Sequence, residues 1–227
     1  MPAYKRKLSR SNATAGSYKR RRLSVAQKAN AALSMARQIK RGIEVKGFGV
    51  SRTGTLTNTE DVKHLTAIPQ GDGNGARDGD HIMVTRVRMK AILASNNASN
   101  FQQMVRIVIV QNLRQQPDTD ATMLSQFTSA DLYGFNLANQ GFKNLLVHYD
   151  KVHAVPMGNE TASTPTYQVG YKHIDINIPM RYPVKVSFNE AAATDIDRNG
   201  FYIIAVSQSS SNSPSLVYEA FVDFTDA

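Results

Sequence analysis

The sequence His81-Ile-Met-Val-Thr-Arg-Val-Arg-Met-Lys-Ala-Ile-Leu-Ala94 decides the fold of this chain. It is rich in β-branched and apolar residues and contains neither glycine nor proline, which predicts a long β-strand. Side chains alternate between the two faces of a strand, so one face would be basic and the other apolar. The expected basic face holds Val84, Arg86, Arg88 and Lys90, and the expected packing face holds Met83, Thr85, Val87, Met89 and Ala91. We interpret the basic face as a solvated surface, with anion binding as the alternative.

Further runs of this kind lie on both sides of it, separated by loops rich in Gly, Pro, Asn, Asp and Ser. One or two helical turns are expected around Ala121–Phe127. The predicted strands are 45–57, 81–94, 102–113, 144–154, 171–178, 183–188, 200–208 and 215–225. They do not alternate with helices, so a parallel sheet is not expected. Eight strands with long, uneven connections predict an all-β chain folded as an eight-stranded jelly-roll sandwich.

The charge of the chain is divided unevenly. The first 41 residues contain twelve Lys and Arg and no Asp or Glu, whereas the whole chain has 27 basic and 18 acidic residues. The formal net charge of +9 therefore combines a basic arm of +12, residues 1–41, with a domain of −3, residues 42–227. The basic residues of the arm are Lys5, Arg6, Lys7, Arg10, Lys19, Arg20, Arg21, Arg22, Lys28, Arg37, Lys40 and Arg41.

The second half of the arm has the composition of a helix. Residues 23–41 are rich in alanine and lack glycine and proline. Ser24 is suited to cap the N-terminus of this helix, and Gly42 is suited to end it. Residues 1–22 contain few apolar side chains and are expected to be disordered in isolation. We therefore predict a basic, partly helical arm with a helix over residues 23–41.

A cationic segment without acids is suited to bind a polyanion. We expect nucleic acid, bound without sequence preference and with steep salt sensitivity, because the energy comes from counterion release. The alternatives are a solubilising tail and adhesion to a membrane surface. The apolar face of the predicted helix is mostly alanine, without Trp or Phe, so no membrane partner is expected. The run Lys19-Arg-Arg-Arg22 is also typical of a nuclear-import signal.

Signatures of catalysis are lacking in the sequence. The chain contains no G-x-S-x-G motif, and its lack of cysteine excludes thiolate chemistry. None of the five histidines has the H-E-x-x-H spacing of a metal site: His64, His81, His148, His153 and His173. We therefore expect a binding or structural protein, not an enzyme.

Two acidic segments are candidates for holding a cation. Asp195-Ile-Asp-Arg-Asn-Gly200 matches the first half of a calcium loop, but Val206 stands where the loop needs an acid. A tight turn before strand 200–208 is therefore favoured there.

The second segment is Gln70-Gly-Asp-Gly-Asn-Gly-Ala-Arg-Asp-Gly-Asp80, which places Asp72, Asp78 and Asp80 within nine residues. Clustered carboxylates suit a hard cation, whereas Asp-Gly is also a common turn sequence, and both interpretations stay open.

Several blocks occur in a suggestive order and spacing along the chain. They are the basic arm, Gly54-Thr-Leu-Thr-Asn58, Ile68-Pro-Gln-Gly-Asp72 followed by Gly79-Asp80, and the terminus Tyr218-Glu-Ala-Phe-Val-Asp-Phe-Thr-Asp-Ala227. Together they resemble the single jelly-roll coat proteins of very small icosahedral viruses, such as satellite tobacco necrosis virus. Similar capsid proteins occur in viruses with small circular single-stranded DNA genomes.

The resemblance implies a capsid protein that self-assembles into a T=1 icosahedral shell of sixty copies, with a jelly-roll shell domain over residues 42–227. The arm would package a single-stranded genome, and the sequence leaves DNA and RNA as alternatives. The expected location is the virion. The protein would also enter the host nucleus if Lys19–Arg22 acts as an import signal. The alternative is a non-viral, sequence-independent nucleic-acid-binding β-domain protein.

The resemblance also implies calcium between subunits. Asp72 matches the acid at the three-fold axis of the family, Asp226 the terminal acid of an inter-subunit site, and Glu44 the acid after the arm helix. Asp78 stands where the family uses a serine carbonyl, and His81 replaces a glutamine that contributes there. The implied Ca²⁺ ligands are Asp72, Asp78, Asp226 and Glu44.

Overall fold

The chain divides into two units, Met1–Ile43 and Glu44–Ala227, and we call the second the β domain. The computed structural model describes residues 25, 28–30, 32–34, 44–58, 61–95, 102–114, 144–155, 170–208 and 213–226.

In the first unit, residues 25, 28–30 and 32–34 are helical, and Val25 and Leu33 are exposed. These residues fall within the predicted helix 23–41. The rest of that helix, the predicted boundary between residues 41 and 42, and the turns expected around Ala121–Phe127 lie outside the described residues. Within the described residues, no helix has the length and apolar character needed to cross a membrane.

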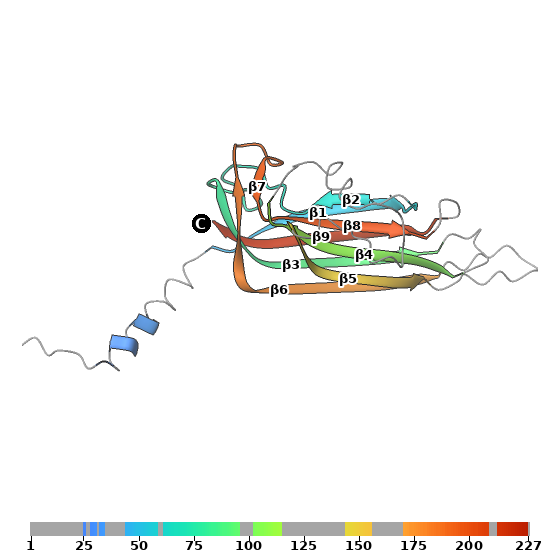
Figure 1. Ribbon diagram of the computed structural model, residues 1–227, viewed down its shortest axis with the longest axis horizontal. Helices are drawn as coiled ribbons and strands as arrows, with labels where there is room; N and C mark the ends of the chain where they lie inside the picture. Colours follow the sequence, from blue (N-terminus) through green and yellow to red (C-terminus); the bar gives the residue numbers. More distant parts are fainter. Residues whose placement is uncertain are drawn as a thin grey trace, which may run out of the picture. The chain divides into compact units, whose positions relative to one another are not determined.

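The β domain consists of two antiparallel sheets whose strands run in similar directions (Figure 1). The first sheet has the order β1 (Lys46–Thr55), β9 (Ser215–Asp226), β3 (His81–Ala94), β6 (Tyr171–Phe188) and β7 (Ile196–Arg198). The second sheet has the order β2 (Asp61–His64), β8 (Gly200–Ser207), β4 (Gln103–Asn112) and β5 (Leu145–Val155).

The connections between the strands give this sandwich its topology. Strands β4 and β5 are sequential neighbours in the second sheet, and β6 and β7 are neighbours in the first. Every other connection between consecutive strands crosses from one sheet to the other. Without the short β7, eight strands remain, four in each sheet, as in a jelly roll. The chain is thus an all-β jelly-roll sandwich, and this prediction is confirmed.

The strand list differs from the prediction in three places. The predicted strands 171–178 and 183–188 form one strand, β6, which includes Pro179 and Pro183. In its pairing with β3, four residues of β6 are skipped, between Pro179 and Val184. Strands β2 and β7 were not predicted, since four and three residues are too short to show periodicity.

Strand β3 contains a bulge, and the predicted faces are wrong for the residues that precede it. Its pairing with both β6 and β9 shifts between Val84 and Arg86, and Thr85 is an extra residue in the ladder with β9, where Phe224 and Asp223 are consecutive. Val84, which we predicted on the basic face, is therefore fully buried, and Met83, predicted on the packing face, is not. Beyond the bulge the prediction holds, with the basic side chains exposed on one face.

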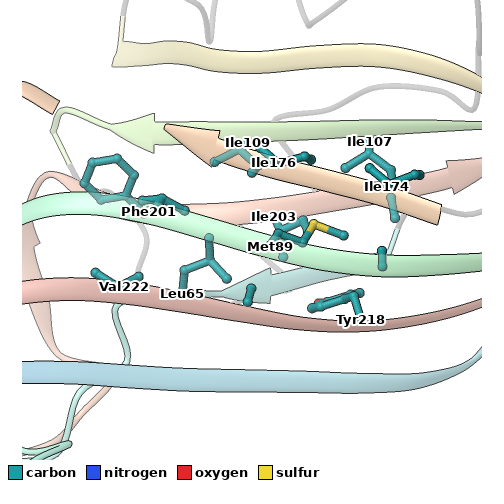
Figure 2. Packing of buried hydrophobic residues seen from close by; sticks show 14 of the residues in the cluster. Leu65, Met89, Ile107, Ile109, Ile174, Ile176, Phe201, Ile203, Tyr218 and Val222 are labelled. Carbon is teal, nitrogen blue, oxygen red and sulfur yellow. The ribbon is translucent and has the colours of Figure 1, made fainter. Parts of the chain in front are cut away.

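The main core lies between the two sheets (Figure 2). Side chains from β3, β6 and β9 of the first sheet face side chains from β4 and β8 of the second. Figure 2 labels ten members of this cluster: Leu65, Met89, Ile107, Ile109, Ile174, Ile176, Phe201, Ile203, Tyr218 and Val222. Burying each large apolar side chain contributes about 1.5–3 kcal/mol, so this interior is the main source of stability.

Strand β8 is buried on both of its faces. Its side chains alternate between the main core and a second apolar cluster that includes Val108, Val110, Tyr202 and Ile204. A strand covered on both sides is a continuous apolar run, and Phe-Tyr-Ile-Ile-Ala-Val follows that pattern.

The acidic segment before β8 is not the single tight turn that we predicted, because Ile196–Arg198 forms β7 and the chain turns at Asn199 alone. Asn199 lies between β7 and β8 with a φ of 64°, a left-handed conformation that asparagine tolerates better than most residues. Its side-chain nitrogen donates to the carbonyl of Lys185 at 2.7 Å, and its side-chain oxygen accepts from Gln111 at 2.9 Å. These contacts fix the turn that leads into β8.

Candidate functional site

The predicted nucleic-acid-binding residues belong to the arm. Lys28 lies in the described helical stretch and is exposed to solvent. The other eleven lie outside the described residues: Lys5, Arg6, Lys7, Arg10, Lys19, Arg20, Arg21, Arg22, Arg37, Lys40 and Arg41.

The predicted cation segment, Gln70–Asp80, belongs to an ordered loop, residues 68–80, between β2 and β3. The backbone nitrogen of Arg77 donates to the carbonyl of Pro69 at 2.9 Å, and that of Gly71 donates to the carbonyl of Arg77 at 3.0 Å. A further bond of 2.8 Å joins the nitrogen of Ala76 to the carbonyl of Gly73. Backbone hydrogen bonds thus fix the loop from within, and its side chains hold it to the rest of the domain.

The buried guanidinium of Arg77 is the first anchor of this loop. It donates to the carbonyl oxygens of Ile68, Gly79 and Glu190 and lies 4.1 Å from the ring centre of Phe188. Its carboxylate partner, Asp80, is 3.6 Å away. Burial lowers the pKa of Arg77, whereas the negative charge of Asp80 raises it. Arg77 thereby joins the loop to the segment that follows β6.

Lys46, the first residue of β1, is the second anchor. Its ammonium nitrogen lies 2.8 Å from Asp78 Oδ1 in the loop and 2.8 Å from Asp226 Oδ2 at the end of β9. A third acceptor, the carbonyl of Ala76, is 3.3 Å away. The backbone nitrogen of Asp78 also donates to Asp226 Oδ1 at 3.1 Å. Two carboxylates far apart in sequence therefore meet at one buried ammonium.

The charges in this cluster stabilise one another. Hydrogen bonds to Asp226 and Asp78 raise the pKa of Lys46, so its side chain stays protonated. Partial burial raises the pKa of Asp226, but the ammonium of Lys46 and the backbone nitrogen of Asp78 outweigh it and lower that pKa. The cluster therefore holds one cation against two carboxylates at neutral pH.

The four implied calcium ligands do not all lie in this cluster. Asp78 and Asp226 meet there, whereas Asp72 and Glu44 are exposed and make no contact with Lys46. Within the described part of the chain, no group of three or more His, Asp or Glu side chains is arranged to hold a metal ion. The chemistry of the cluster differs from that of a calcium site, since an ammonium occupies the position between the carboxylates.

Sequence reasoning missed Lys46, although the sequence holds a signal for it. Lys46, Phe48 and Val50 alternate along β1, and the two apolar residues pack against the core. A lysine at an inward position of a strand must find an anionic partner, because a buried unpaired charge is costly.

The outward face of the first sheet carries the exposed basic side chains of β3. Arg88 lies 2.5 Å from the carboxylate of Asp223 on β9, and Arg86 lies 4.0 Å from it. Lys90 stands in register between Glu219 on β9 and Asp175 on β6. Carboxylates therefore lie beside each of these three cations, which favours our interpretation of a solvated surface over an anion-binding wall.

An aromatic ring lies on the same face. Phe221 is 39% exposed and lies beneath the guanidinium of Arg88, 5.7 Å from its ring centre. It is opposite Gly49 on β1, where an added Cβ would approach the ring to 2.8 Å. Glycine at this position lets the ring lie flat across the neighbouring strand.

The histidines of the sandwich have packing partners. His64 is buried, stacks on Tyr202 with ring centres 4.4 Å apart, and is 3.1 Å from the hydroxyl of Thr66. Burial lowers the pKa of His64 to about 3, so it is neutral at physiological pH. His148 bonds to the side chain of Gln111 and His153 to the hydroxyl of Tyr149, each at 3.0 Å. These contacts satisfy His148, which is partly buried, and His153, which is buried.

Comparison with known proteins adds little. No protein-family model matches the chain, and no curated protein matches it. Among solved structures, a chain of Desmodium yellow mottle tymovirus is similar over 81% of this chain and 88% of that chain, with a TM-score of 0.32 and 10% sequence identity. A similarity of this degree supports no functional conclusion, so the function has to be argued from the residues of this chain.

Proposed function

We propose that this chain is a viral capsid protein that self-assembles into a T=1 shell of sixty copies and packages a single-stranded genome through its basic arm. The observation that carries the proposal is the joining of two parts with opposite character. One is a jelly-roll domain with a net charge of −3, and the other is an arm with twelve cations and no acid. The resemblance of four sequence blocks to small icosahedral coat proteins supports the same function.

The charge division suits such an assembly. Carboxylates on β6 and β9 lie beside the exposed cations of β3, which lowers the repulsion between copies at this face. Sixty arms would bring on the order of 700 positive charges to the packaged nucleic acid, where phosphate neutralisation releases counterions. A carboxylate in the arm would be repelled by phosphate, which explains why the arm contains no Asp or Glu.

The arm also bears on where the protein acts. We infer a location in the virion, with entry into the host nucleus where Lys19–Arg22 serves as an import signal. Both DNA and RNA present the same phosphate charge to such an arm, so the arm chemistry fits either genome.

Nuclease protection in particles with an altered arm tests this function. The full chain is expressed, particles are isolated and treated with nuclease, and the protected nucleic acid per protein chain is measured. The matched variant replaces Lys19, Arg20, Arg21 and Arg22 by Gln, and the control replaces Arg181, Lys185, Arg198 and Lys63 of the β domain by Gln.

We expect the arm variant to protect roughly one third less nucleic acid, in proportion to its lost charge, and the control to protect as much as the unaltered chain. Equal protection by both variants would contradict packaging by the arm. A stable monomer that binds single strands in a salt-sensitive manner would favour the alternative, a nucleic-acid-binding β-domain protein.

A further inference from the structure

We propose that Lys46 is a built-in cation of the β domain, which takes the place of a bound divalent ion between Asp78 and Asp226. Removing its ammonium would then convert the cluster into a divalent-cation site. This inference concerns the stability of the β domain and does not depend on capsid assembly.

The number of acceptors matches the number of donors in the cluster. A lysine ammonium has three N–H donors and no acceptor. Around Lys46 the acceptors are Asp78 Oδ1 and Asp226 Oδ2, each at 2.8 Å, and the carbonyl of Ala76 at 3.3 Å. Each N–H donor of Lys46 therefore has one oxygen acceptor within the fold.

Burial makes this cation a fixed part of the site. The side chain of Lys46 is 6% exposed, whereas those of Asp226 and Asp78 are 26% and 59% exposed. The side chain of Lys46 is therefore much less accessible to solvent than the two carboxylates that it contacts. A divalent ion that approached from solvent would meet a site whose central position is already filled by a positive charge.

The cluster connects three separate parts of the chain. Lys46 begins β1, Asp226 ends β9, and Asp78 belongs to the loop between β2 and β3. The two strands are neighbours, with Lys46 opposite Phe224. The ammonium therefore fastens the C-terminal end of β9 and the loop to the strand that begins the β domain, only two residues after Glu44.

The remaining atoms are suited to a hard cation once the ammonium is gone. Two carboxylate oxygens and a backbone carbonyl are the kind of ligands that Ca²⁺ takes, with water completing its coordination. Without any cation, the two carboxylates would repel each other, which gives the vacated site a reason to bind one.

The test measures thermal unfolding of the full chain with CaCl₂ or with a chelator. We expect the Tm of the unaltered chain to be the same in both. In chelator, we expect Lys46→Ala to have a lower Tm than the unaltered chain. We expect the Tm of Lys46→Ala to rise by roughly 3–6 °C when free Ca²⁺ is about tenfold above the Kd of the new site. Lys46→Met, which fills the space without a charge, should lose stability and gain nothing from Ca²⁺.

A second carboxylate change locates the effect. Adding Asp226→Asn to Lys46→Ala should abolish the gain, whereas adding Asp72→Asn, an exposed aspartate of the same loop, should leave it intact. Two results would overturn the proposal: no gain from Ca²⁺ in folded Lys46→Ala, or a stabilisation of the unaltered chain by Ca²⁺ that disappears in Asp226→Asn. The second result is measured on proteins that keep Lys46, so it tests the proposal even when Lys46→Ala does not fold.

Discussion

Arg77 shows how a single cation organises the loops of this domain. Its guanidinium is fully buried and bonds to three backbone carbonyls that belong to the loop 68–80 and to Glu190. A buried charge of this kind is stable only with partners, and the partners are in turn left without donors when it is removed.

We therefore predict that Arg77→Met lowers the free energy of unfolding by about 3 kcal/mol, because it leaves buried carbonyls without a donor. Urea unfolding followed by circular dichroism measures this change. Arg86→Met is the matched control, since Arg86 lies on the solvated face, and it should change stability by less than about 0.5 kcal/mol. Similar effects of the two substitutions would refute the structural role of Arg77.

His64 gives the domain a pH dependence. Burial lowers its pKa to about 3, whereas a histidine in the unfolded chain titrates near 6.5. Between these values the unfolded chain binds the proton and the folded chain does not, so stability falls as the pH decreases from 6.5 towards 3. Above pH 6.5 His64 is neutral in both states, so its protonation no longer lowers the free energy of unfolding.

The corresponding prediction is that His64→Gln flattens the pH dependence of the free energy of unfolding below pH 6.5 by up to about 1.4 kcal/mol per pH unit. Urea titrations of the full chain between pH 4 and 7 give this slope. His173→Gln, at an exposed position of β6, serves as the control and should keep the original slope. An unchanged slope in His64→Gln would show that His64 is protonated in the folded state.

At the scale of elements, the long strands were predictable because each is an extended run rich in apolar and β-branched residues, alternating with polar ones in β3 and continuous in β8. The bulge in β3 was not, since Thr85 fits either face and only the ladder with β9 reveals it as an extra residue. The two carboxylates of the Lys46 cluster came from a resemblance at the loop and the terminus. Their partner Lys46 was missed because its contacts join β1 to the end of β9 and to the loop before β3, which are far apart in the sequence.

The bulge itself can be tested by deletion. Removing Thr85 would leave every other residue of β3 on its present face, so we predict a folded protein with reduced stability, by about 1–3 kcal/mol. Removing Val87 instead would turn Arg88 and Lys90 towards the core and should prevent folding. Soluble yield and far-UV circular dichroism distinguish the two variants, and equal behaviour of both would contradict the assigned register.

At the scale of the whole molecule, the chain combines an apolar sandwich with a segment that has no reason to fold alone. The interior between the sheets supplies the stability of the β domain. The arm keeps its twelve cations without acidic partners in its own sequence. The proposed capsid function rests on this separation between a stable β domain and a cationic arm.

The mass of the purified full chain in solution tests that function most directly. The proposal predicts a particle with about 1.5 MDa of protein, sixty times the chain mass of 25.0 kDa, together with nucleic acid. Analytical ultracentrifugation at moderate salt, with absorbance recorded at 260 and 280 nm, measures both quantities. A species of about 25 kDa that persists at high protein concentration in the presence of single-stranded nucleic acid would contradict the account.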